Sequence, residues 1–232
     1  MNIIAMGGGG FSQEPDNPRL DRYILNQSAQ ISPKICFIPT ASGDSEDYIQ
    51  RFYEFFEKEN CEPTHLSLLQ QTIADKEAFL LSQDIIYVGG GNTRNLIALW
   101  KEWGLDKILR KALQQEIILA GISAGAICWF EEGLSDSVPG EWSNVPALGY
   151  LHGSLCPHYD GESQRQFHYR SSIETGSMKP GYALDDGAAL HFVGDTIHAA
   201  IASRPEATAY SVTVDNNKVI EKPYDMNYLS ID

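Results

Sequence analysis

Basic side chains are scarce in this chain of 232 residues. Lysine and arginine together number 17 against 31 aspartates and glutamates, which gives a formal net charge of −14. Proteins that bind a nucleic-acid backbone need basic stripes that release its counterions. We therefore expect no nucleic-acid partner for this chain.

Long apolar runs and closely paired cysteines are also missing. No run approaches the roughly 20 apolar residues of a membrane-spanning helix. The first residues, MNIIAMGGGGF, lack the basic start of a signal peptide. The four cysteines include no C-x-x-C pair that would suggest zinc or redox chemistry. These absences predict reduced thiols, no membrane partner and a cytoplasmic location.

Five short apolar runs alternate with amphipathic stretches over the first two-thirds of the chain. They comprise residues 2–6, 34–39, 64–69, 84–88 and 117–120. In the stretches between these runs, apolar residues recur at helical spacing. One such stripe is formed by Tyr48, Ile49, Phe52, Phe55 and Phe56. Near-continuous apolar strands that alternate with helices are typical of a parallel sheet covered on both faces.

Toward the C-terminus the pattern changes to pairs of short runs around turn residues. Residues 188–193 and 196–202 flank Gly194-Asp195, and residues 210–214 and 218–221 flank Asp215-Asn216-Asn217. Both pairs predict antiparallel hairpins. We expect one α/β domain over residues 1–232, finished by antiparallel strands.

Three glycine-rich turns, at residues 7–10, 89–91 and 121–125, directly follow predicted strands. Ligands of open α/β sheets bind at such strand ends. The first turn does not complete a dinucleotide fingerprint, because Ser12 and Gln13 stand where the last small residue belongs. No Walker lysine follows any of the turns. We therefore expect no nucleotide, and no cofactor is predicted.

The third turn carries a candidate nucleophile. Gly121-Ile122-Ser123-Ala124-Gly125 matches G-x-S-x-G between a buried strand and a plausible helix that includes Ala126, Ile127, Trp129 and Phe130. This is the context of a nucleophile elbow, in which the serine sits on a tight strand-to-helix turn. The backbone N–H of Ala124 would then face a developing oxyanion. The competing interpretation is a serine that only caps the helix.

A serine nucleophile needs a base and a carboxylate. His158 follows another short apolar run and is the best-placed histidine; His65, His152, His168, His191 and His198 have weaker settings. Asp136 lies between Ser123 and His158, while Glu131, Glu132, Glu141 and Asp160 compete with it and Asp186 is a distant option. A metal site built from His152, His158, Asp160 and His168 matches no standard ligand spacing, so no metal is predicted.

The two later turns together resemble a known family. Val88-Gly89-Gly90-Gly91-Asn92-Thr93, Gly121-Ile122-Ser123-Ala124-Gly125-Ala126 and the following Pro157-His158 are similar to the motifs of the peptidase E (aspartyl dipeptidase) and cyanophycinase family of serine peptidases. With the βα rhythm, the resemblance covers roughly residues 1–200. It implies a three-layer α/β sandwich with a mostly parallel sheet, like that of class I glutamine amidotransferases.

Carried over by position, the resemblance implies roles for several residues. Ser123 looks like the nucleophile and His158 its general base, with Gly90 or Gly91 as the second oxyanion donor beside Ala124. The family's aspartate falls nearest to Asp136, in Ser135-Asp136-Ser137-Val138-Pro139. That alignment needs a shift of two residues, which leaves Glu132 and Glu141 open.

The resemblance also implies a substrate class. Peptidase E removes an N-terminal aspartate from short peptides, and cyanophycinase cleaves a β-linked aspartyl-arginine polymer. A short peptide is favoured, because no insert for holding a polymer is evident. Arg165 and Arg170 are candidates for pairing with a substrate carboxylate, unless they are ordinary surface charge. Asp186 could bind a substrate amine or arginine, and Asn92 and Thr93 are further candidate substrate contacts.

We therefore expect a cytoplasmic serine exopeptidase with a preference for an acidic residue or a free carboxylate. Cyanophycinase-like or carboxypeptidase activity, an α/β-hydrolase-type esterase and a non-catalytic binding protein are the alternatives. A glutamine amidotransferase would need cysteine in place of Ser123. The sequence predicts no oligomeric state.

Overall fold

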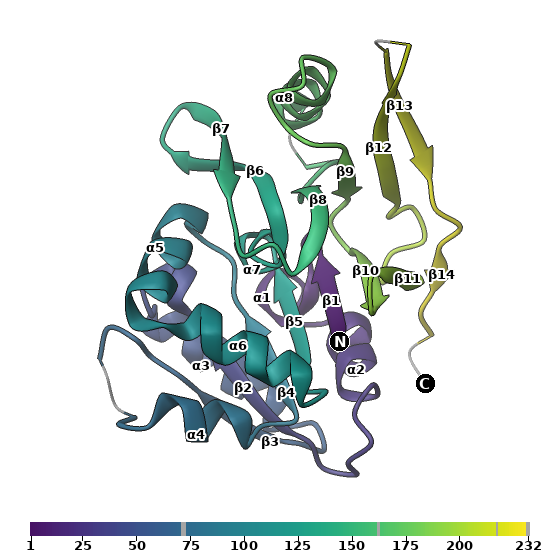
Figure 1. The fold of residues 1–232 in the computed structure, drawn as a ribbon. Helices are drawn as coiled ribbons and strands as arrows, with labels where there is room; N and C mark the ends of the chain where they lie inside the picture. Colours follow the sequence, from purple (N-terminus) through teal and green to yellow (C-terminus); the bar gives the residue numbers. More distant parts are fainter. Residues whose placement is uncertain (71–72, 162, 217, 231–232) are drawn as a thin grey trace.

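The computed structural model describes residues 1–70, 73–161, 163–216 and 218–230 of the chain, which form two sheets and their helices (Figure 1). The strands are β1 (Asn2–Met6), β2 (Lys34–Ile38), β3 (Glu62–His65), β4 (Ile85–Val88), β5 (Ile118–Ile122), β6 (Phe130–Val138), β7 (Glu141–Pro146), β8 (Leu151–Cys156), β9 (Gly181–Leu184), β10 (Ala188–Val193), β11 (Thr196–Ala202), β12 (Ala209–Asp215), β13 (Lys218–Pro223) and β14 (Asn227–Tyr228). The helices are α1 (Gly10–Gln13), α2 (Arg19–Leu25), α3 (Glu46–Phe56), α4 (Lys76–Leu81), α5 (Thr93–Trp103), α6 (Leu105–Gln114), α7 (Ala124–Ile127) and α8 (Ser163–Glu174), with a 3₁₀ turn, η1 (Thr40–Ser42).

The larger sheet has eight strands in the order β14-β11-β10-β1-β5-β4-β2-β3. The five strands from β1 to β3 in that order are parallel, and β10 adds to β1 in the antiparallel sense. The first predicted hairpin, β10 with β11, thus extends the parallel sheet. The α/β class and the mostly parallel sheet are confirmed.

Both faces of this sheet are covered by helices, because successive strand residues point to opposite sides. Ile3, Ala5 and Val88 pack with apolar residues of α5 and α6 on one face. Ile4 and Tyr87 pack with α1, α2 and α3 on the other face. The four inner parallel strands β1, β2, β4 and β5 are therefore apolar and buried along most of their length, whereas β3 at the edge of the sheet is polar.

The smaller sheet has six strands in the order β13-β12-β9-β8-β6-β7, and β7, β6 and β8 in it follow directly from the serine turn. The expected helix after Ser123 is wrong in length: α7 ends at Ile127 and Phe130 already begins β6. The third strand also lies earlier than expected, at Glu62–His65 rather than residues 64–69. The second predicted hairpin is β12 with β13, although Asn217 of its turn lies outside the described residues.

Candidate active site

Ser123 lies on the turn between β5 and α7, at the carboxyl end of the parallel sheet. Its backbone has φ 55° and ψ −115°, a sparsely populated conformation for a residue with a side chain. A Cβ at Gly121 would lie 2.0 Å from the Gly125 carbonyl oxygen, and one at Gly125 would lie 2.2 Å from that of Val88. Both glycines of the motif are therefore required by close backbone packing, and Ser123 is held on a strained strand-to-helix turn with the geometry of a nucleophile elbow.

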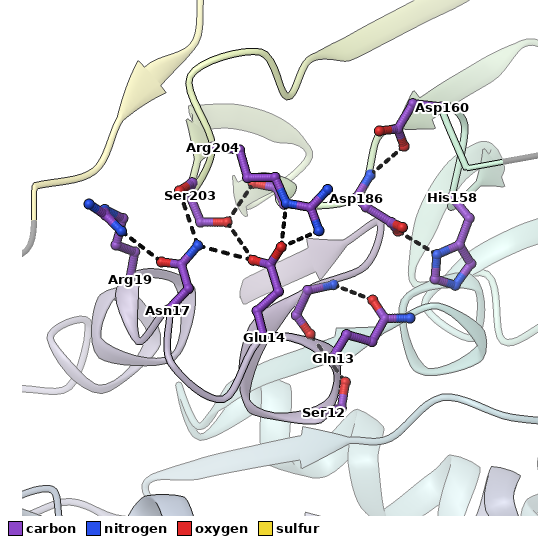
Figure 2. Close-up of polar contacts among 12 residues, drawn as sticks. Ser12, Gln13, Glu14, Asn17, Arg19, His158, Asp160, Asp186, Ser203 and Arg204 are labelled. Atoms are coloured by element: carbon purple, nitrogen blue, oxygen red, sulfur yellow. Dashed lines mark hydrogen bonds and ion pairs between the residues drawn. The ribbon is translucent and has the colours of Figure 1, made fainter.

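His158 follows β8 and is held by a carboxylate from a different part of the chain. Its Nδ1 lies 2.5 Å from Oδ1 of Asp186, and the two side chains are 17% and 23% exposed. The backbone N–H of Asp186 donates to Oδ1 of Asp160 at 2.8 Å, which fixes the loop that presents the carboxylate (Figure 2). The arrangement orients the imidazole so that Nε2 is the nitrogen left for chemistry.

The expected pairing of His158 with Asp136 is wrong. Asp136 lies on β6, is 61% exposed and lies 3.7 Å from the Arg165 guanidinium. Glu132 accepts from Asn144 and from the backbone N–H of Lys179, and Glu141 is exposed on β7. None of these three carboxylates is the hydrogen-bond partner of the imidazole, because Asp186 occupies Nδ1.

The charge environment keeps Asp186 ionised. Burial alone would raise the pKa of this carboxyl, but its hydrogen bond to His158 and the positive charges of His158, Arg204 and Arg165 lower it overall. Arg204 is itself held by an ion pair with Glu14. Figure 2 shows this pair beside Asp186, with Asn17 and Ser203 completing the same group of polar contacts.

The glycine-rich turn after β1 packs against the same carboxylate. Gly8 forms a bridge with Asp186, and Gly187 N–H donates to the Gly8 carbonyl at 3.0 Å. A Cβ on Gly8 would lie 1.8 Å from Oδ1 of Asp186. The glycine-rich turn after β1 thus positions Asp186, the hydrogen-bond partner of His158.

The turn after β4 lies on the other side of Ser123. Gly90 donates its N–H to the Tyr48 hydroxyl at 3.3 Å, and Gly91 has φ 138°. Within the described residues, neither the Gly91 N–H nor the Ala124 N–H has a hydrogen-bond acceptor in the protein. These two backbone donors flank the serine and are free to bind an anion.

Two of the expected substrate contacts are occupied within the protein. Asn92 caps α5, accepting the Asn95 N–H at 3.0 Å, and donates its amide to the Ser137 carbonyl at 2.9 Å. Thr93 is buried and accepts a hydrogen bond from Ser135 at 3.2 Å. Their side chains join the turn after β4 to β6, and neither lines the cleft.

The two expected arginines differ in position. Arg165 is 3% exposed, lies over the Trp142 ring at 4.4 Å and lines the cleft beside His158. Arg170 pairs with Glu221 at 3.2 Å on the smaller sheet and does not line the cleft.

The cleft at Ser123 consists of two adjoining hollows. We name them the Arg51 half, of about 260 Å³, and the Arg165 half, of about 390 Å³. Both are lined by Gln13, Gly91, Ser123 and His158. The Arg51 half adds Ser12, Tyr48, Arg51, Gly90 and Ile122. The Arg165 half adds Asp136, Gly161, Arg165 and Asp186.

Sequence reasoning missed Gln13, Tyr48 and Arg51. They lie on α1 and α3, far from the serine motif in sequence, and only the carboxyl ends of neighbouring strands bring them together. Their one sequence signal is that they follow strands whose turns are rich in glycine or small residues. No group of three metal-ligating side chains occurs among the residues that the structure describes. In the same residues, no helix is long and apolar enough to cross a membrane.

An elbow serine, an imidazole held by a carboxylate and two free backbone donors at the end of a parallel sheet define a serine hydrolase. Comparison with known proteins agrees with that class. The sequence profile of peptidase family S51 matches residues 3–200, and the chain belongs to this family of serine peptidases.

Several relatives carry the same description. The chain is 56% identical over 227 residues to the uncharacterized peptidase YgaJ of Bacillus subtilis, covering 98% of both chains. It is 25% identical over 171 residues to the uncharacterized peptidase Lmo0363 of Listeria monocytogenes, covering 70% of this chain and 83% of the other.

Solved structures share the fold. A candidate peptidase E from Listeria monocytogenes has a TM-score of 0.62 at 19% identity, covering 84% of this chain and 96% of that one. A peptidase from an acI-B1 actinobacterium has a TM-score of 0.65 at 16% identity, covering 97% and 94%.

Proposed function

We propose that this serine peptidase is an exopeptidase of short peptides, with preference for an acidic residue or a free carboxylate, and that its triad is Ser123, His158 and Asp186. The observation that carries the triad is the 2.5 Å contact between His158 Nδ1 and Asp186 Oδ1 beside a strained Ser123. The preference for short peptides rests on the family and on the small volume of the cleft halves.

The chemistry follows from the position of each group. His158 removes the Ser123 proton through Nε2 as the hydroxyl oxygen attacks the scissile carbonyl carbon. Asp186 stabilises the imidazolium that forms, and the Gly91 and Ala124 N–H groups bind the oxyanion. Each such donor is typically worth roughly 3–4 kcal/mol in the transition state.

Collapse of the tetrahedral intermediate breaks the C–N bond. The imidazolium donates its proton to the leaving amine, so that the amine departs neutral and an acyl-enzyme ester remains on Ser123. Water then attacks the ester with His158 again as base, releasing the carboxylic acid and restoring the serine.

Ser123→Ala tests this proposal. The substitution is nearly isosteric, so we expect an unchanged fold and a fall of about 10⁶ in kcat. Adding His158→Ala should cost little more, because triad members act as a unit. Near-normal turnover by the single variant would exclude Ser123 as nucleophile.

Product analysis tests the exopeptidase assignment. Peptides of two to eight residues, with free or blocked ends, are digested and the products are identified by mass spectrometry. We expect single residues or dipeptides to be released from unblocked peptides of two to four residues. Internal cleavage of end-blocked octapeptides would instead indicate an endopeptidase.

A further inference from the structure

Gln13 lines both halves of the cleft, a position shared with only three other residues among those described. The other three are Ser123, His158 and Gly91, for which the proposed mechanism has roles. Gln13 lies at the end of the short helix α1, and Figure 2 shows its side chain extending toward the space below His158. Its location predicts contact with any peptide bound on the serine.

The orientation of the Gln13 amide is set by the glycine-rich turn. Its Oε1 accepts the Gly9 N–H at 2.5 Å. A backbone N–H can only donate, so the facing atom of the amide must be its oxygen. The amide nitrogen, which carries two donors and no acceptor, is therefore directed away from the turn and toward the cleft (Figure 2). Gln13 offers hydrogen-bond donors to a ligand.

Arg51 supplies a cation to the same half of the cleft. Its guanidinium lies over the Tyr48 ring at 5.2 Å, one turn earlier on α3. The buried Tyr48 hydroxyl accepts the Gly90 N–H at 3.3 Å, so the ring beneath Arg51 is attached to the turn beside Ser123. Stacking on a fixed ring reduces the freedom of the guanidinium and keeps it near the nucleophile.

The two halves differ in charge. The residues that line the Arg51 half include one arginine and no carboxylate. The Arg165 half includes Asp136 and Asp186 with one arginine. In a chain of formal net charge −14, an approaching carboxylate is repelled unless a local cation lies within about a Debye length of ~8 Å. The Arg51 half meets that requirement.

We propose that Gln13 and Arg51 form a subsite that binds a carboxylate of the peptide substrate. The inference rests on the proposed peptidase function and assigns its acidic specificity to α1 and α3 in place of Arg165 and Arg170. The guanidinium pairs with the carboxylate, and the Gln13 amide nitrogen donates to one of the carboxylate oxygens. The carboxylate comes from an aspartyl side chain or from the C-terminus of a short peptide.

Four peptides distinguish these sources: Asp-Leu and Ala-Leu, each with a free and an amidated C-terminus. For Arg51→Met we expect kcat/KM to fall roughly ten- to a hundredfold on the peptides that carry the recognised carboxylate. The neutral amidated Ala-Leu should be hydrolysed at the wild-type rate. If only the two Asp-Leu peptides lose activity, the subsite binds the aspartyl side chain. If only the two peptides with a free C-terminus lose activity, it binds the C-terminal carboxylate.

Gln13→Glu tests the second residue without removing its contact with the turn. One carboxylate oxygen still accepts the Gly9 N–H, while the other places negative charge where a donor stood. We expect a loss on the same peptides at least as large as for Arg51→Met, because repulsion replaces attraction. Higher activity of Gln13→Glu than of wild type toward a peptide with an amine in place of the carboxylate would support this change in charge preference.

Arg110→Met is the matched control, since the Arg110 guanidinium lies over the Tyr150 ring at 4.7 Å, away from the cleft. It should change none of the four rates. In Arg51→Met, fluorophosphonate labelling of Ser123 should slow far less than hydrolysis of the carboxylate peptides, because the probe carries no carboxylate. Equal losses on all four peptides, labelling slowed as much as hydrolysis, or no loss on any peptide would overturn the subsite.

Failure of the proposed function gives a different result. In that case the wild-type protein neither labels nor hydrolyses any of the peptides. Calorimetric titration of the four peptides into wild type and Arg51→Met then tests the subsite alone. Weaker binding of the carboxylate peptides to the variant supports it, and equal binding excludes it.

Discussion

At the scale of single residues, the partner of His158 is determined by position in space and not by order in the chain. Asp136 precedes the histidine in sequence but lies beside Arg165, 3.7 Å from its guanidinium. Asp186 follows it, and the loop before β10 brings its carboxylate to Nδ1. A triad is recognised by geometry, and the order of its members varies between folds.

Asp186→Asn should therefore inactivate the enzyme. An amide cannot stabilise the imidazolium and favours the wrong tautomer, so we expect kcat to fall by about 10⁴. Asp136→Asn should change kcat by less than about tenfold, because its carboxylate lies on Arg165 instead. Both variants are assayed on the peptide that the wild type hydrolyses fastest. A larger loss in Asp136→Asn than in Asp186→Asn would contradict the assignment.

At the scale of elements, the glycine-rich turns pack against the residues that line the cleft and hold them in position. The turn after β1 orients Gln13 and packs on Asp186, while the serine turn packs on the carbonyl of Val88 at the end of β4. Side chains at these glycines would collide with different partners. A collision with a movable carboxylate affects the site, whereas a collision with backbone affects the fold.

Gly8→Ala should reduce activity more than stability. The new methyl group would lie 1.8 Å from Oδ1 of Asp186, which can rotate away at the cost of its hydrogen bond to His158. We expect kcat to fall by roughly 10²–10⁴, approaching the loss in Asp186→Asn. Combining the two substitutions should add little, because both remove the same contact. Additive losses would show that Gly8 acts elsewhere.

Gly125→Ala should reduce stability directly. Its methyl group would lie 2.2 Å from the Val88 carbonyl oxygen, and neither α7 nor β4 can move without disturbing the sheet. Overpacking of this kind commonly costs roughly 1–3 kcal/mol, and contact with backbone places the expected cost at the upper end. Urea unfolding measures the change in the free energy of unfolding. A loss below about 0.5 kcal/mol would contradict the predicted collision.

At the scale of the whole molecule, one acidic residue is fully buried in the core. Asp21, on α2, is fully buried in the aromatic cluster that contains Phe11, Tyr48 and Tyr87. Burial raises its pKa to about 7, offset only in part by the Phe11 N–H and the Tyr87 hydroxyl, with a smaller upward contribution from Glu59. The folded state therefore binds a proton that the unfolded chain releases near pH 4.

Because of this proton, the free energy of unfolding should fall as the pH rises toward the pKa of Asp21 in the folded state. The pKa is raised in the folded state, so the stabilising contribution is complete below the unfolded pKa of 3.8 and is lost as pH rises to about 7. Asp21→Asn removes the ionisation. The free energy of unfolding of the variant minus that of wild type should rise by roughly 3–4 kcal/mol between about pH 4 and 7, then stay constant.

Urea unfolding of both proteins at half-unit steps from pH 4 to 8 measures the difference. Ser123→Ala serves as the control, because this substitution removes no carboxyl group. A flat curve for Asp21→Asn as well would show that the buried carboxyl titrates as it does in the unfolded chain.

The sequence by itself determined four of the five parallel strands, both C-terminal hairpins, the Ser123 turn and the family, because these depend on local patterns. Continuous apolar runs require burial on both faces, and G-x-S-x-G requires two glycines for close backbone contacts within a few residues. The smaller sheet was not predicted, since β6 to β9 are partly exposed strands without continuous apolar runs, and β9 pairs with the distant β12.

Only the tertiary structure decided which side chains surround the serine. Asp186, Gln13 and Arg51 come from three separate segments, and no spacing rule connects them to Ser123. Gln13 and Arg51 meet because the carboxyl ends of β1 and β2 lie at one edge of the sheet with those of β4 and β5. Asp186 joins them from the loop between β9 and β10, where it forms a bridge with Gly8 in the turn after β1. A hydrogen bond such as that between His158 and Asp186 depends on distances of a few ångströms, and only the packing of sheets and helices sets those distances.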